Sequence, residues 1–170
     1  SMPSGGGNVY DDTWEFDGTT WTERIVAVRP APRVTHKMAY DEERNRVVLF
    51  GGGNASVSLT DTWEWDGTTW TQIEAASAQG PRGGHVMYFD TQRSTVCVFG
   101  GQGVGGLRSD VWEFDWVGGT WNPRVLVGAP PPRYEAQGCY DPVRQELTVM
   151  GGEAAGNAWL GDVWSLAGNT

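Results

Sequence analysis

The sequence is poor in the residues that build metal sites, disulfide frameworks and membrane spans. Its 170 residues include only 2 Cys and 2 His. Cys97 and Cys139 are too few for a disulfide scaffold and lack the Cys-x-x-Cys spacing of a zinc site, so we expect two buried free thiols and no cofactor. No apolar run approaches the ~18 residues that a membrane span needs, so we expect a soluble chain. No segment resembles a signal peptide, but Ser1 and Met2 read as the remnant of a cloning tag, so the cellular compartment stays open.

Positive charge is also scarce. The chain has 12 Lys and Arg against 21 Asp and Glu, which gives a formal net charge of -9. Phosphate contacts need clustered cations, so this balance disfavours unaided binding to nucleic acid or to an anionic membrane. We therefore expect neither as a partner.

Tryptophan and glycine, in contrast, are abundant, with 10 Trp and 25 Gly. Large packing residues beside frequent turn residues favour many short strands over helices. The segment 61–70, D-T-W-E-W-D-G-T-T-W, is written almost identically at 12–21 and returns in altered form at 110–121 and 162–164. A period of about fifty residues indicates a repeat array, so we expect a single all-β repeat domain.

Each repeat predicts four antiparallel strands. The first strand follows a repeated Arg, the second is an apolar run closed by Gly-Gly, the third carries Asp-x-Trp, and the fourth carries a second Trp after a short turn. The run 47–50 has no polar alternation, which is typical of a strand that is buried on both faces. The Arg and the second Gly keep the same spacing in all three copies, which start at Arg33, Arg82 and Arg133.

These features resemble the kelch repeat, in which Gly-Gly ends the second strand, an aromatic residue lies in the third and a Trp lies in the fourth. The resemblance covers about residues 12–166 and implies that each repeat forms one blade of a β-propeller. Members of the family range from protein-interaction modules to copper oxidases and sugar-processing enzymes. The fold therefore leaves the function open.

The count of strands predicts an incomplete ring. The chain divides into a lead-in with the tag remnant and a kelch-repeat domain that holds two complete blades between two partial ones: 1–11, then 12–168, subdivided as 12–32, 33–81, 82–132 and 133–168. Because propellers close with about four to eight blades, about three blades leave open apolar flanks. We expect a homodimer that completes a six-bladed ring, with the N-terminal strand around Trp21 completing the last blade of the other copy. Segments 12–16 and 162–166 both fit the third-strand position of that blade, and which one is used stays open.

Two equivalent histidines are candidate metal ligands. His36 and His85 each lie three residues after the repeated Arg, where side chains of successive blades can converge on a channel. Without clustered Cys or acidic ligands, hydrogen-bonded inner-strand residues are the preferred interpretation. Cys139 and Tyr140 invite comparison with the copper-oxidase branch of the family, but the chain lacks that branch's further His ligands. The iron-binding pattern of the plant specifier proteins is also absent.

The three repeated arginines have two interpretations. Arg33, Arg82 and Arg133 could form a cationic ring for an acidic ligand, since a guanidinium fork binds carboxylates at two points. We prefer that they pair with the repeated acidic residues and with backbone carbonyls and so tie blades together.

The connections from the second to the third strand and from the fourth to the next first strand differ in sequence from copy to copy. In an antiparallel sheet these loops share one face, and variable loops on a rigid scaffold are typical of a recognition surface. Trp159 is an aromatic outside the repeated positions and a candidate interface anchor, although it could equally pack against the next blade. The other candidates on this face are Ser58, Leu107, Arg108 and Tyr134.

Three functions fit this sequence. The first is a non-catalytic scaffold that binds a protein or peptide through the variable loops. The second is an enzyme that acts on a sugar or another small molecule at the channel mouth, for which the chain offers mainly the repeated arginines and the two histidines. The third is a natural or engineered propeller fragment whose main property is self-assembly, because segments 12–22 and 61–71 are nearly identical.

Overall fold

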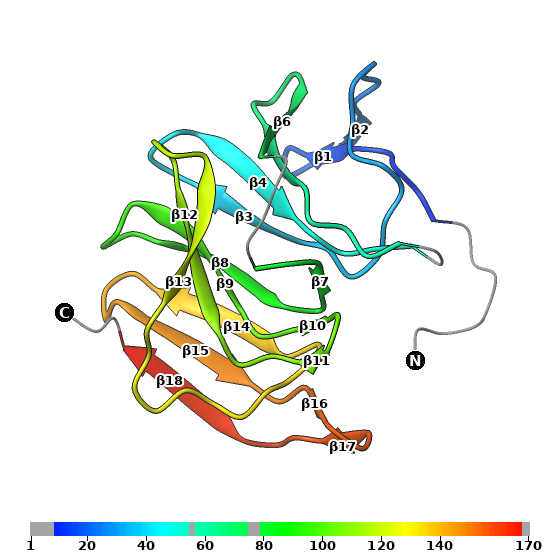
Figure 1. Cartoon of the computed structure of the whole chain (residues 1–170). Coiled ribbons are helices and arrows are strands. Elements are labelled where there is room, and N and C mark those ends of the chain that lie inside the picture. Colours follow the sequence, from blue (N-terminus) through cyan, green and yellow to red (C-terminus); the bar gives the residue numbers. More distant parts are fainter. Residues whose placement is uncertain (1–8, 55–56, 75–78, 168–170) are drawn as a thin grey trace.

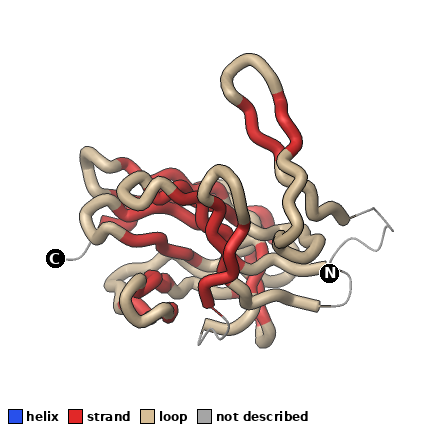
Figure 2. Tube along the Cα trace, turned by 90° about the horizontal axis from the view of Figure 1, so that it is seen from above, coloured by secondary structure: helices blue, strands red, loops and turns tan. Residues whose placement is uncertain are grey.

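The computed structural model describes residues 9–54, 57–74 and 79–167. These residues form strands, turns and loops and no helix (Figure 2), which confirms the predicted all-β class. Within these ranges there is accordingly no helix that could cross a membrane.

Two complete four-stranded antiparallel sheets form the centre of the molecule. The first blade is β3 (Lys37–Asp41), β4 (Arg46–Phe50), β5 (Thr62–Trp65) and β6 (Trp70–Glu74), in that order across the sheet. The second blade repeats this order with β8 (Val86–Asp90), β9 (Thr95–Phe99), β12 (Val111–Asp115) and β13 (Thr120–Arg124).

Incomplete sheets lie at both ends of the chain. The N-terminal hairpin consists of β1 (Trp14–Phe16) and β2 (Trp21–Glu23), which correspond to the third and fourth strands of a repeat. The third blade has three strands, β14 (Gln137–Asp141), β15 (Glu146–Met150) and β18 (Val163–Ala167). No strand in the described residues occupies its fourth position.

The blades follow one another in a row (Figure 1), with β8 between β3 and β14. The hairpin β1–β2 lies beside the first blade, and β18 lies at the opposite end. Five short strands occupy the loops: β7 (Arg82–Gly83), β10 (Gln102–Gly103), β11 (Gly106–Leu107), β16 (Glu153–Ala154) and β17 (Ala158–Trp159).

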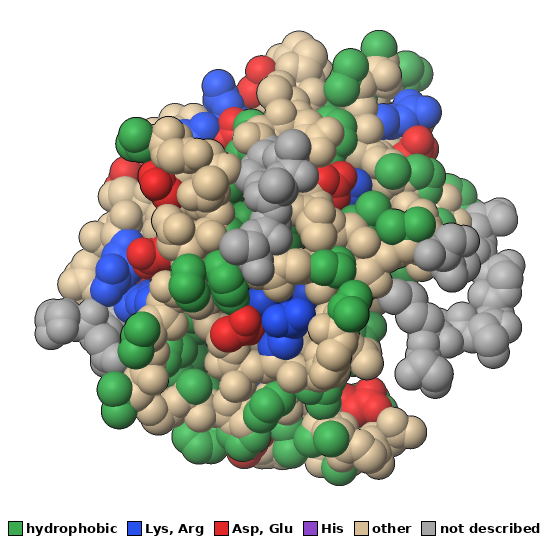
Figure 3. Space-filling model, in the orientation of Figure 1, with side chains coloured by type: hydrophobic (Ala, Val, Ile, Leu, Met, Phe, Trp, Pro, Cys, Tyr) green, Lys and Arg blue, Asp and Glu red, His purple; other side chains and the backbone are tan. Residues whose placement is uncertain are grey.

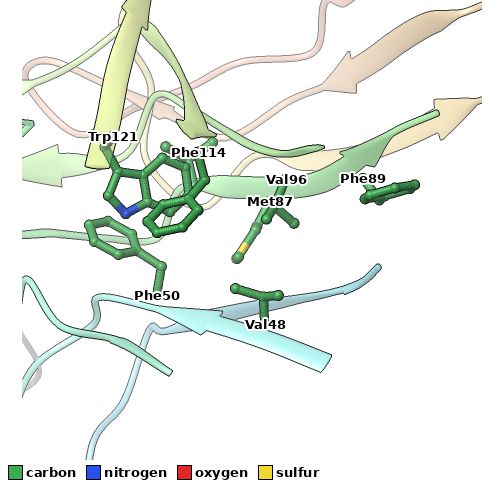
Figure 4. Packing of buried hydrophobic residues seen from close by; sticks show 8 residues of the cluster. Val48, Phe50, Met87, Phe89, Val96, Phe114 and Trp121 are labelled. Atoms are coloured by element: carbon green, nitrogen blue, oxygen red, sulfur yellow. The ribbon is translucent and has the colours of Figure 1, made fainter. Parts of the chain in front are cut away.

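Among the described residues the core consists of three apolar clusters: one on each face of the second blade, and a smaller one in the first blade formed by Leu49, Trp63, Trp65 and Trp70. In the cluster between the first and second blades, Val48 and Phe50 on β4 face Met87, Phe89 and Trp121 (Figure 4). The rings of Phe50 and Trp121 lie 5.0 Å apart. Every residue of β8 and β9 is buried, because a neighbouring blade covers each face.

The expectation of two buried thiols is half wrong. Cys97 and Cys139 are both free, but only Cys97 is buried. Cys139 on β14 occupies the position of Tyr88 on β8, and Tyr88 is covered by the ring of Tyr140 from the third blade. Cys139 is exposed because no blade among the described residues covers the equivalent face of β14.

Candidate binding face

Each repeated arginine forms a clamp inside its own blade. Arg33 donates two parallel hydrogen bonds to Asp61, Nη1–Oδ1 and Nη2–Oδ2, both of 2.7 Å. Its Nη1 also donates to the carbonyl of Gly51 at 3.0 Å, and Asp61 accepts a third bond from Trp63 Nε1 at 2.6 Å. The clamp therefore joins the starts of the first and third strands to the end of the second.

The same clamp recurs in the second and third blades. Arg82 pairs with Asp110 at 2.8 and 3.0 Å, and Arg133 pairs with Asp162 at 2.8 and 2.9 Å. All three arginines are buried. The expected pairing with acidic residues and carbonyls is present, but it ties strands within a blade. Because each guanidinium already binds an aspartate of the chain itself, the three arginines do not offer a free cationic ring to an acidic ligand.

The clamps also set the ionisation of their aspartates. Burial by itself would raise the pKa of Asp61 and Asp110, but the hydrogen bonds from the paired arginine and from the neighbouring Trp indole outweigh it and lower the pKa below the ordinary value. Hydrogen bonds from Arg133 and Trp164 likewise lower the pKa of Asp162. The three carboxylates are therefore ionised in the fold at neutral pH.

The two histidines differ in their surroundings. His85 is fully buried against Phe50, and burial, followed by the nearby Arg82 charge, lowers its pKa to about 3. Neither of its ring nitrogens has a hydrogen-bond partner among the described residues. Burial and the Arg33 charge lower the pKa of His36 as well. The described part of the chain holds no group of three His, Cys, Asp or Glu residues that could bind a metal ion.

A cavity of about 500 Å³ opens on the face that carries the variable loops. The loops between the second and third strands of all three blades line it. Three of the predicted binding residues, Ser58, Leu107 and Tyr134, are among the lining residues. Arg108 and Trp159 belong to the same loops but lie outside the lining.

The ring of Tyr134 packs against Gly84, in the space that a side chain at that position would fill. A Cβ atom on Gly84 would collide with Tyr134 Cε2, so the ring lies directly against this glycine. Gly84 also has a φ of 60°, a left-handed conformation that glycine adopts without strain. The tyrosine ring is thereby fixed at the cavity wall.

A main-chain ladder joins the blades beside the cavity. Thr35, Gly84 and Glu135 are equivalent residues, and all three have left-handed φ angles of 57°, 60° and 54°. The amide of Gly84 donates to the carbonyl of Thr35 at 2.9 Å, and the amide of Glu135 donates to the carbonyl of Gly84 at 2.8 Å. A second ladder runs from the amide of Gly52 to the carbonyl of Arg82, and from the amide of Gly101 to the carbonyl of Arg133, each at 2.9 Å.

The family comparison agrees with this repeat geometry. A family model described as the KLHDC2/KLHL20/DRC7 Kelch-repeats domain matches residues 4–170. The chain belongs to the kelch-repeat family. No protein of curated function matches it significantly. Kelch-repeat domains generally mediate protein–protein interactions and are typically non-enzymatic scaffolds.

Several residues that line this cavity were not predicted from the sequence. Thr35, Gln102, Glu153 and Asn157 line it as well. Thr35 could have been found, because it follows Val34, which the spacing after the repeated Arg makes equivalent to the predicted Tyr134. Glu153 is the one carboxylate among the described lining residues, and the other polar side chains carry hydroxyl or amide groups. This lining offers hydrogen bonds to a ligand more than acid–base chemistry.

Proposed function

We propose that this chain is a non-catalytic kelch-repeat scaffold that binds a protein or peptide partner on its cavity face. The observation that carries the proposal is the cavity of about 500 Å³, to which the variable loops of all three blades contribute. Concave sites with a few convergent polar groups are where proteins usually bind ligands. The family's general role in protein–protein interaction supports a macromolecular partner.

Exposed apolar side chains at the margin of the cavity support a peptide over a small polar molecule. Val104, in the lining, is 78% exposed, and Trp159 on β17 is 79% exposed. Trp is enriched among the residues that dominate binding energy when an interface covers them. An extended peptide could place polar groups against Gln102 and Asn157 and an apolar side chain on Trp159.

Val104 and Val117 are a matched pair of exposed valines on opposite faces, and substituting each tests which face binds the partner. A peptide would be selected from a displayed library on the immobilised chain, and its affinity would be measured for Val104→Asp, Trp159→Ala and Val117→Asp. Val117 is 99% exposed in the turn between β12 and β13, on the opposite face. The first two variants should bind at least about tenfold more weakly, since anchor residues typically contribute over 1 kcal/mol. Equal loss from Val117→Asp would refute the assignment of the face.

We also propose that two copies associate to complete a six-bladed ring. The flank of the first blade is open: Met38 and Tyr40 are 52% and 54% exposed, whereas their equivalents Met87 and Phe89 in the second blade are 9% and 8% exposed. Hydrophobic side chains also lie on the surface at the hairpin end and at the β18 end of the row (Figure 3). Exposed apolar flanks of this kind favour a partner.

The mass in solution tests this second proposal. Light scattering should report a species near twice 18.5 kDa. A well-folded monomer at micromolar concentration would refute it.

A further inference from the structure

The slot between the hairpin β1–β2 and the first blade is a half-filled copy of the cluster in Figure 4. A cavity of about 230 Å³ lies there, lined by Met38, Val47, Leu49, Trp65 and Trp70. By strand register, the equivalent residues in the second blade all belong to the filled cluster or pack against it: Met87, Val96, Val98, Phe114 and Trp121.

The side chains that fill the complete cluster are Val48 and Phe50, on the second strand of the preceding blade. Their equivalents on β15 of the third blade are Thr148 and Met150. Both are exposed, and Met150 is 58% exposed although Phe50 is fully buried. The slot on the first blade and the flank of β15 are therefore the two halves of one interface. A second copy of the chain is the occupant that supplies the missing half.

The main-chain ladders have matching open ends. To continue the first ladder, the carbonyl of Glu135 in one copy needs a donor, and the amide of Thr35 in a second copy is the equivalent donor. To continue the second ladder, the amide of Gly152 in one copy needs an acceptor, and the carbonyl of Arg33 in the second copy is the equivalent acceptor. Within the described ranges none of these four groups has a main-chain hydrogen bond. The third blade of one copy thus matches the first blade of another, donor against acceptor.

Two strands compete for the third position in this seam, β18 of one copy and β1 of the other. The indole of Trp70 is buried and donates to Thr13 Oγ1 at 2.9 Å, as Trp121 donates to Thr62 Oγ1 at 2.9 Å. The residue of β18 in this register is Val163, because Val163 faces Met150 as Thr62 faces Phe50. Valine has no acceptor, so β18 at this position would leave the Trp70 indole unpaired.

The clamp leads to the same choice. Asp12 already accepts a bond from Trp14 Nε1 at 2.7 Å, as Asp162 does from Trp164 at 2.6 Å. Asp12 has no arginine partner among the described residues, whereas Arg133 holds Asp162. Exchange of Asp162 for the Asp12 of a second copy would conserve every bond of the clamp.

On the basis of the proposed self-association, we infer that β1 of a second copy replaces β18 beside β15 when the ring closes. β18 is then a plug on the edge of β15, and Arg133 passes from Asp162 to Asp12 of the other copy. Met150 enters the slot formed by Met38, Trp65 and Trp70. The plug keeps this edge covered until the second copy arrives.

Two equivalent aspartates test the exchange. Asp12→Asn removes the clamp from the closed ring only, so the dimer should dissociate at a concentration at least roughly tenfold higher, since loss of a buried charge partner is costly. Asp162→Asn removes it from the plugged state only, so the dimer should become several-fold tighter. The dissociation constants would be measured by sedimentation, with circular dichroism to confirm folding.

A mixing experiment tests the slot itself. Met38→Lys and Met150→Glu should each be monomeric alone, and their mixture should recover dimers because one seam then joins Lys to Glu and the other is native. A mixture that stays monomeric would overturn the assigned interface. If the wild type is a dimer but Asp12→Asn tightens it and Asp162→Asn weakens it, the exchange of β18 for β1 is refuted while the self-association stands. If the wild type is a monomer, the self-association on which the exchange rests is refuted.

Discussion

Replacing Arg82 with Met tests whether the clamps hold the strands of a blade together. The substitution keeps an apolar stem and removes the fork, which is fully buried and bonded to Gly100 O at 3.1 Å and to both oxygens of Asp110. Breaking a buried ion pair costs ~3–5 kcal/mol. The Asp110 side chain is 36% exposed, so water recovers part of this loss, and we expect about 2–3 kcal/mol.

Urea unfolding followed by tryptophan fluorescence, at one fixed protein concentration, measures the loss. The urea concentration at the midpoint of unfolding should fall, with little change in the dependence of the unfolding free energy on urea. The melting temperature should fall by about 5–10 °C. Arg144→Met is the control, because Arg144 is exposed and its pair with Asp141 lies on the surface. That variant should change stability by no more than ~0.5 kcal/mol. If Arg82→Met were no worse than Arg144→Met, the clamp would not be a main source of stability.

Two further predictions concern buried groups. Burial lowers the pKa of His85 to about 3, below its ordinary 6.5, so its contribution to stability is full above about pH 6.5 and is lost as the pH falls toward 3. His85→Phe should therefore lose less stability than the wild type between pH 6.5 and 4, and parallel losses would contradict this. Burial also raises the pKa of Cys97 to about 12, so a maleimide should label the native protein once, at Cys139, and the unfolded protein twice by mass spectrometry. Two labels on the native protein would show that Cys97 is accessible.

The repeat allowed the strands to be predicted, because each strand carries its own local signal. The Asp-Gly turns are an example: Gly18 and Gly67 have φ angles of 97° and 91°, as a tight hairpin turn requires. The pairing of Arg33 with an aspartate could also be predicted from residue types. Its location inside one blade could not, because sequence spacing does not show which of several equivalent aspartates lies nearest in space.

The cavity could be predicted only in part. Ser58 and Leu107 were found because their loops vary between copies, but the cavity exists because three distant loops converge, which no local pattern encodes. The short hairpins β10–β11 and β16–β17 follow no repeated motif. The exposure of Cys139 was missed because burial was judged from the residue type, whereas it depends on whether another blade follows.

The ladder through Thr35, Gly84 and Glu135 has a consequence for how this surface can change. Its contacts run from main chain to main chain, so the spacing between blades does not depend on which side chains stand at these positions. Thr35 and Glu135 can therefore be substituted, within the limits of a left-handed backbone, without moving the scaffold. Gly84 is the exception, since any side chain there would displace Tyr134. New binding specificity can thus evolve at the cavity wall by changing side chains alone, while the geometry of the blades stays the same.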